Sequence, residues 1–180
     1  YIFNSKDLCM IEHIPEMVEA GIGSFKIEGR MKTPLYVAMV TKVYREAIDA
    51  YMADSAHYRR QVPYFKGLLS QVSHRGYSTG FYLGAPGAEE QVYHESAYTK
   101  SRSFAAKVLQ YDPLSKRALV EQRGKFSEGE PLEILLPKGE PVLFNVEDLR
   151  DQEGEPIASA PHAQQLVSLR VPVEVPEGAI

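Results

Sequence analysis

Ser24-Phe25-Lys26-Ile27-Glu28-Gly29-Arg30 is the stretch of this chain that decides its fold class. Its alternation of polar and apolar residues, with an aromatic and a β-branched side chain, predicts a short strand over residues 24–28. Thr33 and Pro34 then offer an N-cap and a first helical residue, and a long helix is expected after them. One strand and one helix cannot cover both faces of a parallel sheet. We therefore expect residues 1–55 to be an incomplete piece of an α/β domain.

The segments on either side of this stretch have weaker patterns. Residues 4–9 read as a helix start, and residues 15–20 as a short helix. A further helix is expected over residues 64–72. Residues 74–87 combine glycines with aromatic side chains, which indicates an ordered loop rather than a solvated linker. Residues 56–90 are therefore interpreted as a helical and Gly/aromatic connector.

The C-terminal half has the pattern of a small all-β domain. Turn signals recur at intervals of about ten residues. Such spacing is typical of a small closed β-barrel, which we place at residues 91–180. The expected strands cover residues 104–111, 117–122, 131–136, 142–145 and 166–171. The fold class is accordingly α+β.

Composition and charge limit the functional classes. No apolar run approaches the length of about 18 residues that a membrane span requires, and a single cysteine is typical of the reducing cytoplasm, where we expect the protein to reside. The net charge of −4 hides an asymmetry, because residues 57–125 carry +6 and residues 126–180 carry −8. A basic segment attracts phosphate backbones, whereas the acidic end repels them.

Cys9 is the only thiol of the chain. Three interpretations are open: a buried structural residue, a metal or cluster ligand, and a nucleophile with His13 as its base. An iron–sulfur cluster requires four ligands, so the second interpretation requires three more cysteines outside this chain.

Two groups of charged residues are candidates for substrate contacts. Lys26, Glu28 and Arg30 lie where the expected strand ends, which is the edge that holds substrates in α/β barrels; a structural salt bridge is the alternative. The second group is basic and interleaved with aromatic residues, so RNA contact is expected, with packing between domains as the alternative for the aromatics. Its members are Arg59, Arg60, Arg75, Lys100, Arg102 and Lys107. The histidines match no zinc spacing, and no hydrolytic triad signature is present.

Several motifs of the chain, in the right order, resemble peptidase family U32, the collagenase-like proteases. They are Asn4-Ser5-Lys6-Asp7-Leu8-Cys9, Phe25-Lys26-Ile27-Glu28-Gly29-Arg30-Met31-Lys32, His74-Arg75-Gly76-Tyr77-Ser78-Thr79-Gly80-Phe81-Tyr82 and Gly129-Glu130-Pro131-Leu132-Glu133-Ile134. The resemblance implies that the chain is the C-terminal portion of such a protein. Residues 1–55 would then be the end of a TIM-like catalytic barrel, and residues 91–180 a β-barrel similar to domain II of elongation factors.

The resemblance also carries expectations about activity. Some members of the family are regarded as peptidases, whereas others hydroxylate a tRNA or rRNA base or a quinone precursor and depend on a 4Fe-4S cluster. Cys9 resembles the last of the four cluster cysteines. We expect the parent protein to be an RNA hydroxylase, the β-barrel to bind its substrate, and this chain alone to hold no cluster and to be inactive.

The alternatives are a genuine collagenase-like peptidase, acting on protein, and a non-catalytic barrel that binds RNA or protein. The expected partners are tRNA or rRNA, the upstream catalytic domain of the same protein and, through apolar surface on the truncated barrel, a second copy of the chain.

Overall fold

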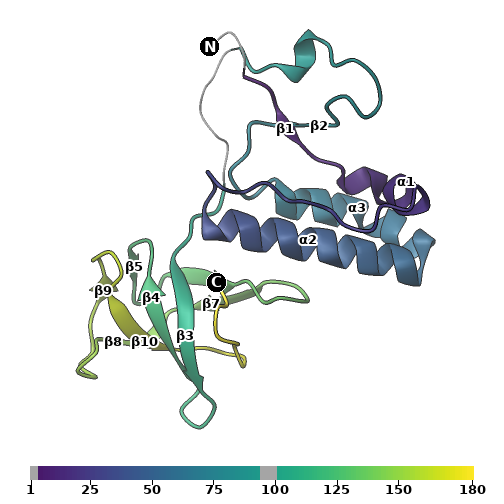
Figure 1. Ribbon diagram of the computed structural model, residues 1–180. Coiled ribbons are helices and arrows are strands. Elements are labelled where there is room, and N and C mark those ends of the chain that lie inside the picture. Colours follow the sequence, from purple (N-terminus) through teal and green to yellow (C-terminus); the bar gives the residue numbers. More distant parts are fainter. Residues whose placement is uncertain (1–3, 94–100) are drawn as a thin grey trace. The chain divides into compact units, whose positions relative to one another are not determined.

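The computed structural model describes residues 4–93 and 101–180. It divides into two compact units, with the boundary between Arg102 and Ser103, which we call the N-terminal and C-terminal units (Figure 1). The three-part division at residues 55 and 90 stays a prediction. None of the helices in the described residues combines the length and apolarity needed to cross a bilayer.

The N-terminal unit combines helices with one small parallel sheet (Figure 1). Strand β1 pairs in parallel with β2, with Asp7 opposite Tyr77 and Leu8 opposite Ser78. Parallel neighbours need a long crossover, and here helices provide it. The elements are β1 (Asp7–Leu8), η1 (Ile11–His13), α1 (Ile14–Glu19), α2 (Pro34–Ala53), α3 (Ser55–Leu69), β2 (Tyr77–Ser78) and η2 (Ala88–Glu90).

Helix α2 begins where the sequence predicts. The Thr33 hydroxyl accepts a hydrogen bond from the Tyr36 amide at 3.3 Å, and Pro34 is the first helical residue. Helix α3 starts earlier than expected, because the Asp54 carboxylate caps it by accepting from the Ala56 amide at 2.8 Å. The expected start at residue 64 rests on the helical spacing of Leu68, Leu69 and Val72, and the observed helix includes Pro63 before it.

Helices α2 and α3 pack against each other and form the core of the N-terminal unit. The buried face of α2 includes Met39, Val43 and Ala47. The sequence pattern of this helix predicts one apolar stripe, and the structure buries only part of it, since Val40 and Ala47 are buried whereas Val37 is 40% exposed. The predicted stripe consists of Val37, Val40, Tyr44, Ala47, Ile48 and Tyr51. Self-association through this helix stays a prediction.

Two expected elements of the N-terminal unit are wrong. Residues 4–9 do not start a helix, since β1 lies within them, and residues 24–28 form no strand. A strand needs a neighbour whose peptide groups complete its ladder. Within the described residues of this unit, the single parallel pair is made by β1 and β2, and residues 24–28 have no strand to join.

The C-terminal unit consists of short strands. A four-stranded antiparallel sheet has the order β3-β4-β10-β8, and the pairs β5-β9 and β6-β7 stand beside it. Each expected strand has a counterpart, whereas β5, β8 and β9 are additional. The bounds are β3 (Ala106–Asp112), β4 (Arg117–Gln122), β5 (Phe126–Ser127), β6 (Pro131–Ile134), β7 (Val142–Asn145), β8 (Glu147–Arg150), β9 (Ser159–Ala160) and β10 (Leu166–Arg170).

The expected closed β-barrel is not confirmed. The strands form three separate sheets among the described residues, and none of these sheets closes on itself. A single apolar core nevertheless lies between them and includes Phe126, Leu149 and Val167. The chain end completes it, because the amide of Val108 donates to the carbonyl of Ala179 at 2.9 Å.

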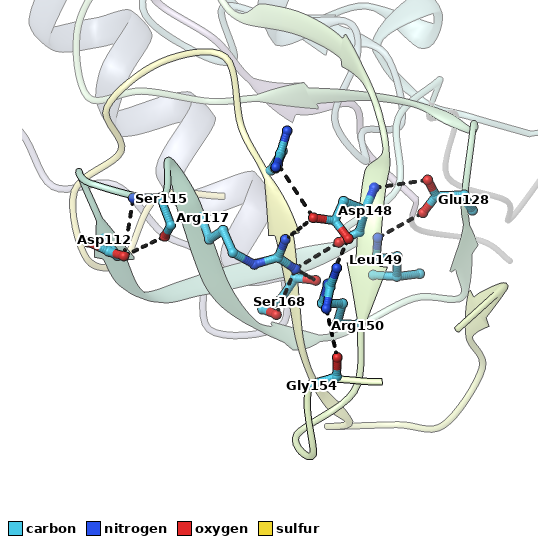
Figure 2. A network of polar contacts seen from close by, with 10 residues as sticks. Asp112, Ser115, Arg117, Glu128, Asp148, Leu149, Arg150, Gly154 and Ser168 are labelled. Atoms are coloured by element: carbon cyan, nitrogen blue, oxygen red, sulfur yellow. Dashed lines mark hydrogen bonds and ion pairs between the residues drawn. The ribbon is translucent and has the colours of Figure 1, made fainter. Parts of the chain in front are cut away.

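A polar network at Asp148 fastens β8 to β4 and β10 (Figure 2). The Asp148 carboxylate pairs with the guanidinium groups of Arg117, Arg150 and Arg170. Its backbone has a φ of 54°, a left-handed conformation that aspartate tolerates better than most side chains. The Glu128 carboxylate fixes this part of β8 by accepting from the amides of Asp148 and Leu149, both at 2.9 Å.

Candidate functional site

The candidate site lies at the carboxyl ends of β1 and β2. Cys9 directly follows β1, and its amide donates to the carbonyl of Ser78 at 2.9 Å. Thr79 follows β2 at the same edge. In α/β folds with parallel strands, ligands gather at this edge because the loops that leave the strands meet there.

A cavity of about 270 Å³ opens at this edge. Cys9, Ser78 and Thr79 contribute to its lining from the strand ends, and Glu90 contributes from η2. One carboxylate oxygen of Glu90, Oε2, is buried and has no hydrogen-bond partner among residues 4–93 and 101–180. Buried polar atoms are nearly always satisfied in folded proteins. Glu90, a residue of the cavity lining, therefore carries an acceptor oxygen that the described residues leave unsatisfied.

The rim of the cavity carries an ion pair between two helical elements. Lys66 of α3 and Glu12 of η1 approach to 2.8 Å, and both side chains are about half exposed. Exposed pairs of this kind contribute little to stability. Both groups are therefore accessible to a polar ligand at the mouth of the cavity.

The Cys9 thiol is partly buried next to a phenol. The Tyr44 hydroxyl lies 3.8 Å from Cys9 Sγ and accepts a hydrogen bond from the Met10 amide at 2.8 Å. Burial raises the pKa of the Cys9 thiol, while hydrogen bonds from the Ile11 backbone and the Tyr44 hydroxyl partly oppose that rise. Burial also raises the pKa of Tyr44, which keeps the hydroxyl protonated.

These conditions do not favour a nucleophilic Cys9. A catalytic cysteine needs a lowered pKa and a base beside it. The ring of His13, the base considered from the sequence, instead contacts the Glu16 carboxylate at 3.3 Å. A metal ligand differs in this respect, because binding of the metal itself removes the thiol proton.

An ion cluster holds β1 in place just before Cys9, and we call it the Asp7 cluster. Asp7 Oδ1 accepts from Nε and Nη2 of Arg75 at 3.1 and 2.9 Å, and Oδ2 accepts from Lys32 Nζ at 2.9 Å. Arg75 Nη1 also donates to Asn4 Oδ1 at 2.9 Å. The Asp7 side chain is only 10% exposed. Two of the family motifs, residues 4–9 and residues 74–82, are thus joined by these contacts. The contacts fix the backbone that positions Cys9.

The other candidates for a substrate pocket lie at the surface. Lys26, Glu28 and Arg30 are all exposed on an irregular segment, and Glu28 Oε1 accepts from the Arg30 amide at 3.1 Å. Among the described residues, no hydrogen bond or ion pair joins them to a residue that lines the cavity. Their role in substrate binding stays a prediction.

The expected RNA-binding residues divide by their surroundings. Arg59 and Arg60 are exposed on α3, and Lys107 is exposed on β3. Arg75 belongs to the Asp7 cluster, and Arg102 donates to Gln71 Oε1 at 2.7 Å. The sixth residue of the set, Lys100, lies outside the described residues.

Sequence reasoning missed three residues that shape the site. Glu12 gives no signal beyond its charge, and Lys32 occurs in the motif of residues 25–32 without a role assigned to it. Tyr44 belongs to the predicted apolar stripe of its helix. A tyrosine in such a stripe usually directs its hydroxyl to a polar partner, and that general rule could have drawn attention to it.

The residues present fit one ligand of a metal cluster rather than a complete site. Within residues 4–93 and 101–180, no group of three or more His, Cys, Asp or Glu side chains is arranged to hold a metal ion. Cys9 offers a thiol beside a cavity, and thiolates are the ligands that iron–sulfur clusters require. The donor chemistry is therefore suitable, and the remaining ligands would come from outside this chain.

Comparison with known proteins gives consistent matches over both units. Residues 1–92 match the model of peptidase family U32, and residues 100–180 match the model of the peptidase family U32 C-terminal domain. A tRNA hydroxylation protein P1 of Bacillus subtilis is 37% identical over 95% of this chain and 40% of its own length. A collagenase of Porphyromonas gingivalis is 31% identical over 83% of this chain and 42% of its own length. The chain thus spans about two fifths of each relative.

Among solved structures, the C-terminal domain of a Geobacillus thermoleovorans protein assigned to the U32 peptidases is 32% identical. The match covers 43% of this chain and 95% of that domain, with a TM-score of 0.42. Because the two family models together span nearly all of its residues, the chain belongs to peptidase family U32.

Proposed function

We propose that this chain is the C-terminal part of a protein that hydroxylates tRNA, and that Cys9 is one of four ligands of an iron–sulfur cluster in that protein. The observation that carries the proposal is the similarity to a tRNA hydroxylation protein over 95% of the chain, which includes both units. The thiol beside a cavity at the carboxyl edge of a parallel sheet supports it.

The chemistry of hydroxylation explains why a cluster is needed. Conversion of a base C–H group to C–OH is a two-electron oxidation; when water supplies the oxygen atom, two protons are released and two electrons must pass to an acceptor. No protein side chain of this chain can accept those electrons reversibly, and a bound iron–sulfur cluster supplies electron transfer. In this proposal the ion pairs of the Asp7 cluster hold β1 in place, and Cys9 is a ligand of the iron–sulfur cluster. Three cysteines outside the chain would be its other ligands.

The remaining residues have roles in binding the RNA. Arg59, Arg60 and Lys107 have exposed cationic side chains that can contact phosphates. Glu90 lines the cavity, and its carboxylate can accept from an N–H donor of the substrate there. We propose that the C-terminal unit binds substrate, and that the protein works in the cytoplasm, where tRNA is located.

The experiment uses the full-length protein that contains this chain, purified without oxygen. We expect it to contain iron, to be brown, and to add one oxygen atom to tRNA when supplied with an oxygen donor and an electron acceptor. Cys9→Ser should lose iron and activity together, whereas Ser101→Ala, an exposed position, should retain both. A colourless, iron-free protein would contradict the cluster, and unmodified tRNA would contradict the function.

The role of the C-terminal unit has its own test, which this chain can provide. Binding to unmodified tRNA should weaken as salt rises, because cations that contact phosphates release counterions. Lys107→Glu should weaken binding further. Binding that does not depend on the salt concentration, or no binding at all, would exclude the RNA role. The remaining alternative would be a binding site for protein.

A peptidase is the second candidate, favoured by the similarity to a collagenase over 83% of the chain. It predicts that the full-length protein cleaves gelatin and that Cys9→Ser does not affect cleavage if the thiol is only structural. Retained cleavage in an iron-free protein would establish this alternative over hydroxylation.

A further inference from the structure

The hydroxyl of Tyr44 is placed between a backbone donor and the sulfur of Cys9. The Met10 amide donates to the hydroxyl oxygen at 2.8 Å, and the oxygen lies 3.8 Å from Cys9 Sγ. A hydroxyl has one proton to donate. Since the amide occupies an acceptor position, the proton is free to point toward the sulfur.

The Cys9 sulfur has different surroundings toward helix α2 and toward the cavity. Helix α2 supplies the phenol, while the cavity wall includes Cys9 together with Ser78 and Thr79. Tyr44 itself does not line the cavity. A ligand that enters the cavity can therefore reach Cys9 without displacing the tyrosine.

We propose that Tyr44 is a positioning residue that donates a hydrogen bond to the Cys9 sulfur and raises the reduction potential of the cluster that Cys9 ligates. The proposal rests on the function proposed above, because it assumes the cluster. Reduction adds negative charge that the ligand sulfurs share, so a donor stabilises the reduced form more than the oxidised form.

The first test is a redox titration of the full-length protein, followed by the absorbance of the cluster. Tyr44→Phe keeps the ring and removes the hydroxyl, and we expect the potential to shift to lower values while the iron content stays near that of the unmodified protein. The matched control is Tyr51→Phe, because Tyr51 lies on the same helix and its hydroxyl donates to Glu19 Oε1 at 2.8 Å, away from Cys9. Its potential should not change.

The second test uses this chain alone and needs no cluster. With one cysteine in the sequence, its infrared spectrum contains a single S–H stretching band, which reports the hydrogen bonding of Cys9. We expect Tyr44→Phe to shift this band and Tyr51→Phe to leave it in place. Circular dichroism of each variant verifies that the helices are retained.

The outcomes separate this inference from the proposed function. Equal potentials in the two variants, each with full iron content, would overturn the role of Tyr44 and leave the hydroxylase intact. An iron-free full-length protein would remove the cluster and the tuning role together, while a shifted S–H band would still establish the hydrogen bond. A band unmoved in both variants would contradict the hydrogen bond itself.

Discussion

In each unit one aspartate forms ion pairs with several cationic side chains, but the two aspartates differ in burial and in surroundings. Asp7 in the N-terminal unit is 10% exposed and pairs with Lys32 and Arg75, whereas Asp148 in the C-terminal unit is 27% exposed and pairs with three arginines. The C-terminal unit has a continuous apolar core beneath its network. By contrast, none of the four residues of the β1-β2 pair is fully buried, and ion pairs of Asp7 join β1 to Lys32 and Arg75. We therefore expect the ion pairs of Asp7 to contribute more to the stability of their unit than the Asp148 network contributes to the stability of its own.

The largest expected effect comes from the core of the C-terminal unit. Phe126 is 1% exposed, and Phe126→Ala should lower the free energy of unfolding of this unit by about 3–5 kcal/mol, because it leaves a cavity in packed surroundings. Urea unfolding with hydrogen exchange of β3 to β10 measures the loss. The control is Leu143→Ala, 68% exposed, which should cost less than about 0.5 kcal/mol. Equal losses would contradict the assignment of the core.

The second effect removes the charge of the Asp7 cluster. Asp7→Asn leaves Lys32 and Arg75 partly buried without their carboxylate, and it should cost the N-terminal unit about 2–4 kcal/mol. Hydrogen exchange of the β1 and β2 amides in urea measures this loss of stability. Asp49→Asn is the control, since its pair with Arg45 is more than half exposed on both sides and should be worth less than about 1 kcal/mol. If both variants lost the same stability, the ion pairs beside Cys9 would not be structural.

A smaller effect tests the start of α2. Thr33→Ala removes the oxygen that accepts from the Tyr36 amide, and it should cost about 1 kcal/mol. Thr33→Ser retains an acceptor and should recover most of that loss. Thermal unfolding followed by helical circular dichroism measures both variants, and indistinguishable transitions in Thr33→Ala and the unmodified chain would contradict the cap.

The smallest expected effect is on the stability of the C-terminal unit at low pH. The Arg150 guanidinium, by hydrogen bonding, together with Arg117 holds the pKa of Asp148 below its ordinary value of 3.8. A depressed pKa in the folded state means that Asp148 stabilises the fold when charged. That contribution is complete above the ordinary value and is lost as the pH falls through the folded value.

Urea midpoints of the C-terminal unit should therefore fall slightly more below pH 3.8 in the unmodified chain than in Asp148→Asn. The Asp112 carboxylate, whose pKa is lowered by hydrogen bonds from the Ser115 hydroxyl and nearby amides, is retained in both proteins. An identical acid dependence in the two proteins would exclude a contribution from Asp148.

Local signals predicted the elements that local contacts determine. Thr33 and Pro34 mark the start of α2, and turn residues mark the strands of the C-terminal unit. The candidate site depends instead on partners distant in sequence, since Asp7 and Arg75 are 68 positions apart and Cys9 and Tyr44 are 35 apart. Periodicity carries no information about such contacts. The prediction of a strand over residues 24–28 is wrong for the same reason, because the sequence of a strand does not show whether a neighbouring strand is present to pair with it.

The central claim is that Cys9 and the Asp7 cluster serve tRNA hydroxylation. The most direct measurement is mass spectrometry of tRNA nucleosides from cells that lack their own hydroxylation activity and express the full-length protein. We predict a nucleoside heavier by one oxygen atom with the unmodified protein and its absence with Cys9→Ser at equal protein level. The same amount of hydroxylated nucleoside with Cys9→Ser, or none with either protein, would contradict it.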